Sequence, residues 1–239
     1  AIEEAITEKT RAVLINTPNN PTGRIYPSET LEALASLLTV ASERIGHPIY
    51  VLSDEAYSRI VFDDCVFLSP ANFYQHTMLI YTYGKTLLTP GQRIGYIALA
   101  PQMPQKELLR GALFASQLMT GYAFPNALLQ HALPELESLS IDVLHYQHKR
   151  DRMVAMLRQI GYETNQPEGT FYLLVRSPLE DDMRFVQRLA DQQVYCLPGS
   201  FVEMPGFFRI SLTANNDMIE RSLPAFREVL HAVSADEER

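Results

Sequence analysis

The sequence predicts an α/β fold in which a mostly parallel sheet carries helices on both faces and is followed by a small α+β region. Three observations predict this fold. Short apolar segments alternate with a helical pattern in the first hundred residues, these segments are apolar on both sides, and the pattern changes from about residue 104. We expect residues 1–120 to form the sheet domain and residues 121–239 to form an interdomain helix and a small C-terminal domain.

The sheet domain is expected to hold four strands, each an apolar run that ends in turn or polar residues. The predicted strands are residues 12–16, 49–52, 78–82 and 94–100. Residues 2–10 have the pattern of a helix that leads into the first strand. After that strand, Ser28 is a predicted N-cap, because it follows Pro27 and precedes apolar residues at helical spacing up to Val40.

The second region mixes longer helices with short strands. The spacing of apolar residues predicts helices at residues 107–120, 125–139, 141–160, 181–192 and 216–232, and strands at residues 171–175, 194–197 and 208–212. Phe201, Phe207 and Phe208 fit either an apolar pocket or the core of this small domain, and we favour the core.

Composition and charge exclude several classes of protein. The 239 residues carry a formal net charge of −8, which argues against a nucleic-acid partner because phosphate binding needs clustered Lys and Arg. Cys65 and Cys196 lie far apart and outside any CxxC spacing, so we expect neither a metal site nor a disulfide. No stretch is apolar and long enough to cross a bilayer, and the acidic first residues do not have the pattern of a signal peptide. We therefore expect a cytoplasmic protein with no membrane partner.

Polar side chains follow three of the predicted strands. Asn20, Asp54 and Lys85 each come soon after an apolar run, and ligands of parallel sheets gather at the carboxyl ends of the strands. Taken alone, Asn20 is typical of a turn, Asp54 of a helix cap and Lys85 of an exposed turn lysine. A partly desolvated lysine at this edge would instead have a lowered pKa, which makes its amine available for Schiff-base chemistry.

Two arginines lie in or beside apolar strands. Arg93 enters a predicted buried strand, where an arginine must be paired, so it could form a structural ion pair or could bind a phosphate through its two-pronged guanidinium. Arg209 is a lone charge in the predicted strand 208–212, where a buried arginine needs an anion, and a substrate carboxylate would serve. Asp54 could be a buried carboxylate that faces a cationic ring nitrogen, with Tyr57 nearby as a hydroxyl donor.

Together these residues stand in motifs that resemble the fold-type I, class I/II aminotransferases, the aspartate aminotransferase superfamily, which use pyridoxal 5'-phosphate. The motifs are residues 16–23 (NTPNNPTG), 53–57 (SDEAY), 82–85 (TYGK) with Arg93, 167–172 (PEGTFY) and 208–211 (FRIS). Their order and spacing fit along essentially the whole chain, and agreement of so many separate motifs is far more specific than any one of them.

The resemblance implies a role for each of these residues in turn. Lys85 is expected to form the Schiff base (aldimine) with the cofactor and to shuttle the proton once substrate has displaced it. Asp54 is expected to keep the pyridine nitrogen protonated, so that the ring can act as an electron sink. Asn20 and Tyr57 are expected to donate hydrogen bonds to the phenolic oxygen of the ring.

The same resemblance assigns the anion-binding residues. Thr82 and Arg93 are expected to bind the cofactor phosphate, and Arg209, with Asn20, is expected to bind the carboxylate of the amino-acid substrate. One position departs from the family pattern: the family often has Ser before the lysine, and this chain has Gly84.

The resemblance implies transfer of an amino group between an L-amino acid and a 2-oxo acid, and other readings stay open. β-Elimination at a C–S bond begins at the same carbanion, so the motifs do not separate a lyase from a transaminase. An aminotransferase-like effector domain of a transcription regulator is a third reading. A degraded, non-catalytic relative is a fourth, although Lys85, Asp54 and Arg209 are all present.

Family members carry a long N-terminal portion before the Asn-Pro-Thr-Gly region. It holds a phosphate-binding helix start and an aromatic residue that stacks on the cofactor. We therefore expect this chain to be a C-terminal fragment that binds pyridoxal phosphate poorly by itself, and we expect the full-length protein to be a homodimer.

Overall fold

The computed structural model describes residues 1–237, and their contacts divide them into two compact units. Unit 1 comprises Ala1–Pro18, Ile25–Ile60 and Val66–Ile141. Unit 2 comprises the chain from Asp142 onward and two short segments, Asn19–Arg24 and Val61–Cys65. The sequence pattern placed a boundary at residue 120, whereas the contacts group the chain up to Ile141 with the sheet.

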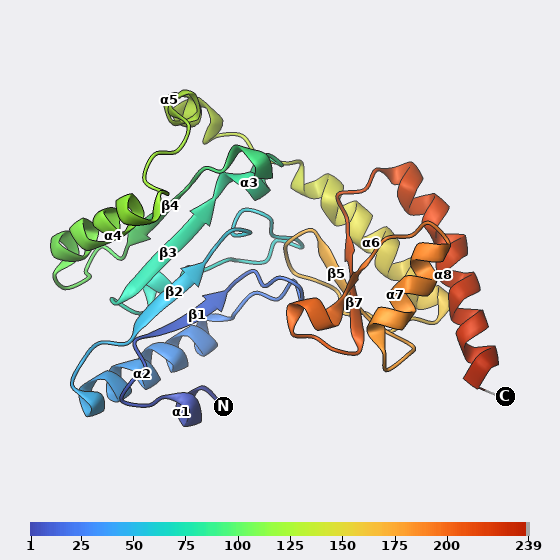
Figure 1. The fold of residues 1–239 in the computed structure, drawn as a ribbon, viewed down its shortest axis with the longest axis horizontal. Coiled ribbons are helices and arrows are strands. Elements are labelled where there is room, and N and C mark those ends of the chain that lie inside the picture. The colour runs from blue at the N-terminus through green and yellow to red at the C-terminus, as the bar shows by residue number, and fades with distance from the viewer. Residues whose placement is uncertain (238–239) are drawn as a thin grey trace. The chain divides into compact units, whose positions relative to one another are not determined.

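The sheet of unit 1 has the order β1-β2-β3-β4 (Figure 1). Its strands are β1 (Ala12–Asn16), β2 (Tyr50–Asp54), β3 (Thr77–Thr82) and β4 (Gly95–Leu99). The first three are parallel and β4 is antiparallel to β3, which confirms a mostly parallel sheet. Asn16 stands opposite Asp54, and Asp54 stands opposite Ile80, so the polar ends of β1 and β2 lie at the same edge.

Helix α2 (Ser28–Ile45) covers one face of this sheet. Its buried residues Leu31 and Leu38 join the cluster that holds Ile15 of β1 and Val51 of β2. The sequence suggested Ser28 as the N-cap, but Ser28 already lies in the first turn of the helix. The cap position falls on Pro27, whose side chain accepts no hydrogen bond. The helix ends at Gly46, whose φ of 78° is the left-handed conformation that glycine adopts readily.

The other face of the sheet is only partly covered by the residues that the structure describes. Helix α4 (Lys106–Thr120) contributes Leu109 and Leu113 to a cluster around Met78 of β3. On β1, by contrast, the Leu14 side chain is 66% exposed. Helices α2 and α4 thus lie on opposite faces of the sheet, as expected, and the second face stays exposed at Leu14 of β1.

The remaining helices of unit 1 are short. They are α1 (Ile2–Ala5), η1 (Pro70–Asn72), α3 (Tyr83–Thr86), η2 (Pro90–Gln92) and α5 (Ala127–Leu136). The predicted helix over residues 2–10 stops at Ala5 because Thr7 and Thr10 form a turn of their own, in which Thr7 N donates to Thr10 Oγ1 at 2.9 Å.

Unit 2 builds a small antiparallel sheet in the order β5-β7-β6 and packs helices against it. Its elements are β5 (Tyr172–Arg176), β6 (Leu197–Pro198), β7 (Phe207–Ser211), α6 (Val143–Ile160), α7 (Asp182–Asp191), η3 (Gly199–Val202) and α8 (Asn216–Glu237). Phe208 is fully buried, as expected of a core residue. Phe201 is 66% exposed, so the expected core does not include it.

Among the residues that the structure describes, none of the helices combines the length and the apolar character needed to cross a bilayer.

Candidate active site

Asp54 ends β2 at the carboxyl edge of the parallel strands. Its Oδ1 accepts a hydrogen bond from Ala56 N at 3.1 Å, and its backbone oxygen accepts from Asn16 Nδ2 at 3.0 Å. The side chain is half-buried, whereas the sequence suggested a buried carboxylate. Asp54 therefore caps the following turn and also presents a partly exposed carboxylate at this edge.

Lys85 lies in α3 with its amine close to Tyr57. The Nζ atom is 5.5 Å from the centroid of the buried Tyr57 ring, a distance typical of a cation–π contact. Lys85 is half-buried, and among the described residues none accepts a hydrogen bond from its amine or forms an ion pair with it. The amine is thus held near a phenol without being consumed by a structural interaction.

Thr82 joins β3 to the helix that carries Lys85. Its hydroxyl accepts from Gly84 N at 3.2 Å and donates to Ile94 O at 3.3 Å, so it caps α3. A Cβ at Gly84 would lie 3.2 Å from Pro90 Cα and 3.3 Å from Thr82 Oγ1. This crowding gives a physical reason for glycine at the position where the family often has serine.

Two tyrosines fasten α3 to its surroundings. The hydroxyls of Tyr81 and Thr86 share a hydrogen bond of 2.6 Å, and Tyr83 donates to Glu137 Oε2 at 2.7 Å. Burial, together with the Glu137 carboxylate, raises the pKa of Tyr83 far above its ordinary value, so the hydroxyl stays a donor. Glu137 also forms an ion pair with Arg59. Its part in holding α3 has no signal in the sequence, because Glu137 lies far along the chain from Lys85.

Glu55 is the buried carboxyl group beside this edge. Its Oε1 accepts from Ser69 Oγ at 2.6 Å and from Ser53 Oγ at 2.9 Å. Burial raises the pKa of Glu55, and the two serine hydroxyls partly offset that effect. These bonds tie the end of β2 to the segment before β3, which places Asp54 next to them.

Arg93 departs from its expected setting. The sequence suggested a buried arginine that needs a partner, but Arg93 is exposed, has a φ of 53° just before β4, and donates from Nη1 to Pro90 O at 3.1 Å. With Thr82, Tyr96 and Lys106 it lines a hollow of about 730 Å³ in unit 1. An exposed guanidinium beside a hydroxyl remains suited to an anion.

Arg209 lies in unit 2, where it meets Asn20. Its Nη1 donates to Asn20 Oδ1 at 2.8 Å, and its Cζ lies 4.0 Å from the centroid of the Tyr172 ring. Arg209 is half-buried, whereas the sequence suggested a buried arginine that needs an anion. In the structure its guanidinium contacts Asn20 and the Tyr172 ring instead. The sequence placed Tyr172 in a motif but did not single it out, because the pairing of β5 with β7 brings it under Arg209.

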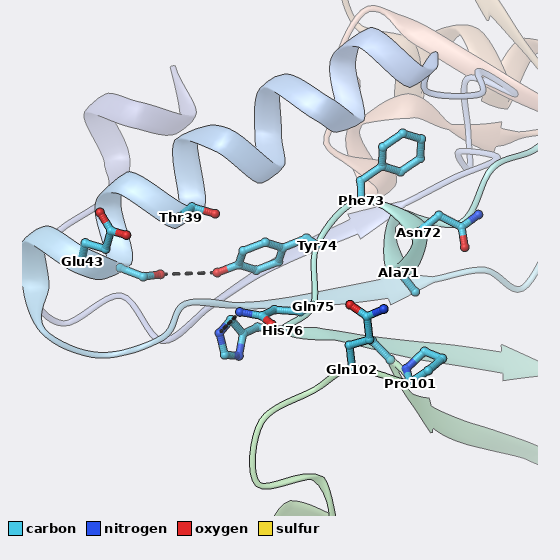
Figure 2. A pocket seen from close by; sticks show the side chains of 12 residues that line it. Thr39, Glu43, Ala71, Asn72, Phe73, Tyr74, Gln75, His76, Pro101 and Gln102 are labelled. Atoms are coloured by element: carbon cyan, nitrogen blue, oxygen red, sulfur yellow. Dashed lines mark hydrogen bonds between the residues drawn. The ribbon is translucent and has the colours of Figure 1, made fainter.

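A second hollow of about 640 Å³ lies at the opposite end of the strands, before β3 and after β4 (Figure 2). In Figure 2 the Tyr74 side chain points toward α2, where its hydroxyl lies 3.4 Å from Ser42 Oγ. Burial lowers the pKa of His76, and the described residues of the lining include Glu43 but neither Lys nor Arg. Among its described lining residues, this hollow therefore has no lysine that could take the role proposed for Lys85.

A family model described as "Aminotransferase class I and II" matches residues 1–226. The chain belongs to the aminotransferase class I and II family. This result confirms the resemblance that the sequence motifs carried.

Relatives within the family are similar over nearly all of this chain. An aspartate/prephenate aminotransferase of Thermus thermophilus is 31% identical over 242 residues, which cover 96% of this chain and 59% of that protein. An aspartate aminotransferase of Thermotoga maritima is 30% identical, with coverage of 97% and 59%. This chain therefore spans about 59% of the length of these curated relatives.

Solved structures of aminotransferases share this fold. An amino transferase from Eubacterium rectale superposes with a TM-score of 0.92 at 33% identity, over 97% of this chain and 58% of that chain. The Thermotoga maritima aspartate aminotransferase superposes with a TM-score of 0.81 at 29% identity, over 96% of this chain and 59% of that chain.

The residues at the carboxyl edge of the unit 1 sheet fit the chemistry of pyridoxal phosphate. The cofactor has an aldehyde, a basic ring nitrogen and a phosphate. Unit 1 brings an amine (Lys85), a carboxylate (Asp54) and a phenol (Tyr57) to one edge, and a hydroxyl (Thr82) and a guanidinium (Arg93) to one hollow. Each cofactor group thus has a residue of matching chemistry.

Proposed function

We propose that this chain carries the lysine-bearing part of a pyridoxal-phosphate-dependent aminotransferase that moves an amino group between an L-amino acid and a 2-oxo acid. One observation carries the proposal: the half-buried Lys85 amine has no hydrogen-bond or ion-pair partner among the described residues and lies 5.5 Å from the Tyr57 ring, at the strand edge that also bears Asp54. Because no described residue accepts a hydrogen bond from this amine, it remains available for a chemical role.

Five residues of unit 1 would hold the cofactor. Lys85 would bond to its aldehyde carbon, Asp54 would pair with its ring nitrogen, and Tyr57 would donate to its ring oxygen. Thr82 and Arg93 would bind its phosphate. When bound, the cofactor supplies an electron sink for the charge that develops on the substrate's α-carbon.

Lys85 is the proposed proton carrier. A neutral primary amine can accept a proton at Nζ and release it to a neighbouring carbon, as general acid–base catalysis requires. Thr82 caps the helix of Lys85, and the hydroxyls of Tyr81 and Tyr83 hold that helix in place. This support limits where the amine can travel during the transfer.

Arg209 is the residue proposed to bind the substrate carboxylate. A guanidinium can donate two parallel hydrogen bonds to a carboxylate, and the Tyr172 ring 4.0 Å from Cζ fixes the plane in which it does so. Asn20 fixes one edge of the guanidinium through its 2.8 Å bond to Nη1. The names of the relatives make L-aspartate the first amino donor to test.

A single-turnover experiment tests the proposal. The full-length protein is supplied with pyridoxal phosphate and L-aspartate without any acceptor, and the cofactor is analysed by chromatography. We expect conversion to pyridoxamine phosphate with an equal amount of oxaloacetate, and a loss of about 10²- to 10⁴-fold in rate for Lys85→Ala. The control Lys9→Ala replaces an exposed lysine that does not line the hollow of Thr82 and Arg93, and it should keep the wild-type rate. Release of ammonia without pyridoxamine phosphate would point to elimination and contradict amino transfer.

A further inference from the structure

The turn that carries Asn20 is built against a loop far along the chain. This Asn20 turn, Asn19–Arg24, docks on residues 165–169, which we call the 165–169 loop. Glu168 N and Gly169 N donate to Gly23 O at 2.9 and 3.0 Å. Two consecutive peptide N–H groups of the loop therefore converge on one carbonyl of the turn.

The docking leaves no room for a side chain at Gly23. A Cβ there would lie 2.1 Å from Pro167 Cβ, and the φ of 69° also favours glycine. Beside this contact, Asn165 Nδ2 donates to Thr22 O at 2.6 Å. The position of the Asn20 turn is thus set by the 165–169 loop.

Within the turn, Asn19 orders the backbone around Asn20. Asn19 Oδ1 accepts from Thr22 Oγ1 at 2.7 Å, and Asn19 O accepts from Gly23 N at 2.7 Å. Asn20 is held between these bonds and places its Oδ1 2.8 Å from Arg209 Nη1. Any shift of the loop is therefore passed to the Asn20–Arg209 pair.

Arg150 of α6 fixes the 165–169 loop from the other side. Its side chain is 0% exposed, and its Nη1 donates to Pro167 O at 2.9 Å. Nη1 and Nη2 also bind the Asp63 carboxylate at 2.6 and 2.7 Å, while Nε and Nη2 bind Asp151 Oδ1 at 2.9 and 2.6 Å. All five N–H donors of the guanidinium are thereby engaged.

The partner of Arg150 lies on the second segment that joins unit 2. Asp63 belongs to Val61–Cys65, and within that segment Phe62 N donates to Glu168 O at 2.8 Å. The 165–169 loop therefore lies between two segments, with Arg150 bonded to the loop and to one of them. The buried Arg150 side chain thus joins the 165–169 loop to the Val61–Cys65 segment.

We propose that Arg150 is a positioning residue that holds Asn20 against Arg209 and so sets the affinity for the substrate carboxylate. This inference rests on the proposed function for its substrate class. A lysine at position 150 cannot span Asp63, Asp151 and Pro167 at once, because an ammonium has no planar fork. The loop then loosens, the Asn20 turn follows, and Arg209 loses the neighbour that orients its guanidinium.

The matched experiment compares Arg150→Lys with Arg152→Lys in the full chain. Arg152 lies on the same helix and binds Glu220 through two 3.0 Å hydrogen bonds, but it is exposed and is not bonded to the loop. Two quantities are measured by NMR: amide exchange across the Asn20 turn, and the dissociation constant for L-aspartate followed at Arg209 Nε–H. For Arg150→Lys we expect faster exchange and a dissociation constant raised about tenfold, and for Arg152→Lys changes below about twofold.

A lower melting temperature with both quantities unchanged would overturn the proposal and leave Arg150 a purely structural residue. If Arg150→Lys does not fold, Asp63→Asn replaces it, since it keeps the bonds of Arg150 to Pro167 and Asp151, and the same changes are expected at about threefold. If wild-type Arg209 does not respond to L-aspartate, the proposed carboxylate site fails. The amide exchange rates of the Asn20 turn and the chemical shift of Arg209 Nε–H without ligand then still decide whether Arg150 positions the Asn20–Arg209 pair.

Discussion

Lys85 differs from the other three lysines of the chain in what its amine contacts. Lys106 Nζ donates to Pro101 O at 3.1 Å, Lys149 Nζ donates to Leu212 O and Ala214 O, and Lys9 is exposed. Lys85 has only the Tyr57 ring among described partners. The sequence could single out Lys85 because a turn after a buried strand is a local feature.

Other residues of the candidate site could not be found in the same way. Tyr172 and Arg150 act through partners that folding brings from distant parts of the chain, such as Asp63, which is 87 residues from Arg150. Arg93 was placed correctly beside β4, but its burial was misjudged, since a strand pattern does not reveal that the residue before the strand takes a left-handed conformation.

Replacing Tyr172 should weaken carboxylate binding by removing the ring under Arg209. We expect Tyr172→Leu to raise the dissociation constant for L-aspartate about 2- to 30-fold, the range of a cation–π contact. Tyr172→Phe keeps the ring and should stay near wild type. Calorimetric titration gives both constants, and equal weakening by the two variants would show that the hydroxyl, not the ring, matters.

Glu55 makes stability depend on pH. Its pKa is raised in the folded state, so the folded protein binds the proton more tightly than the unfolded chain does. Ionisation therefore costs stability, and this cost is absent below the unfolded pKa of about 4.3 and grows as the pH rises through the folded pKa. Relative to Glu55→Gln, the wild-type protein should lose free energy of unfolding as the pH rises.

Urea unfolding of the two proteins at several pH values measures this difference. A constant difference between about pH 4 and pH 8 would mean that Glu55 titrates alike in the folded and unfolded states.

At the scale of elements, the sequence predicted each strand by its apolar run but could not give its direction. The predicted strand at residues 12–16 coincides with β1, and the others agree within a few residues. That β4 runs antiparallel to β3 depends on how the chain returns through η2, which apolar periodicity does not encode. The division after Ile141 was also missed, because α5 has a helical pattern whichever unit it joins.

Helix α2 depends on its buried face. Leu38 is fully buried against the sheet, so Leu38→Ala should lower the free energy of unfolding by about 2–5 kcal/mol. Val40 lies on the same helix with its side chain 66% exposed, and Val40→Ala should change it by less than about 0.5 kcal/mol. Chemical denaturation compares the pair, and similar losses for both would contradict the packing described for α2.

At the scale of the whole molecule, the proposed chemistry is distributed over both units. Lys85, Asp54 and Tyr57 belong to unit 1, whereas Asn20 and Arg209 belong to unit 2. The sequence presented Asn20 as a neighbour of the first strand, but contacts assign its turn to the unit of Arg209. The residues proposed to bind the substrate carboxylate therefore both belong to unit 2, whereas the proposed cofactor lysine belongs to unit 1.

Unit 1 also carries many exposed apolar side chains beyond the sheet. On or near α4 and α5 they are Leu108, Phe114, Met119, Tyr122, Phe124 and Leu128. Neither helix has a buried residue, although the spacing of their apolar residues predicted both helices. Periodicity thus identified the elements, and it could not show how much of each is covered.

The proposed role of Lys85 is tested by finding which lysine bonds to pyridoxal phosphate. The protein is incubated with the cofactor and reduced with borohydride, which fixes even a weak adduct, and the modified peptide is identified by mass spectrometry. With four lysines in the chain, the other three serve as internal controls. We expect modification at Lys85, and we expect it to be lost in Lys85→Arg. Preferential modification of Lys9, Lys106 or Lys149 would contradict this role.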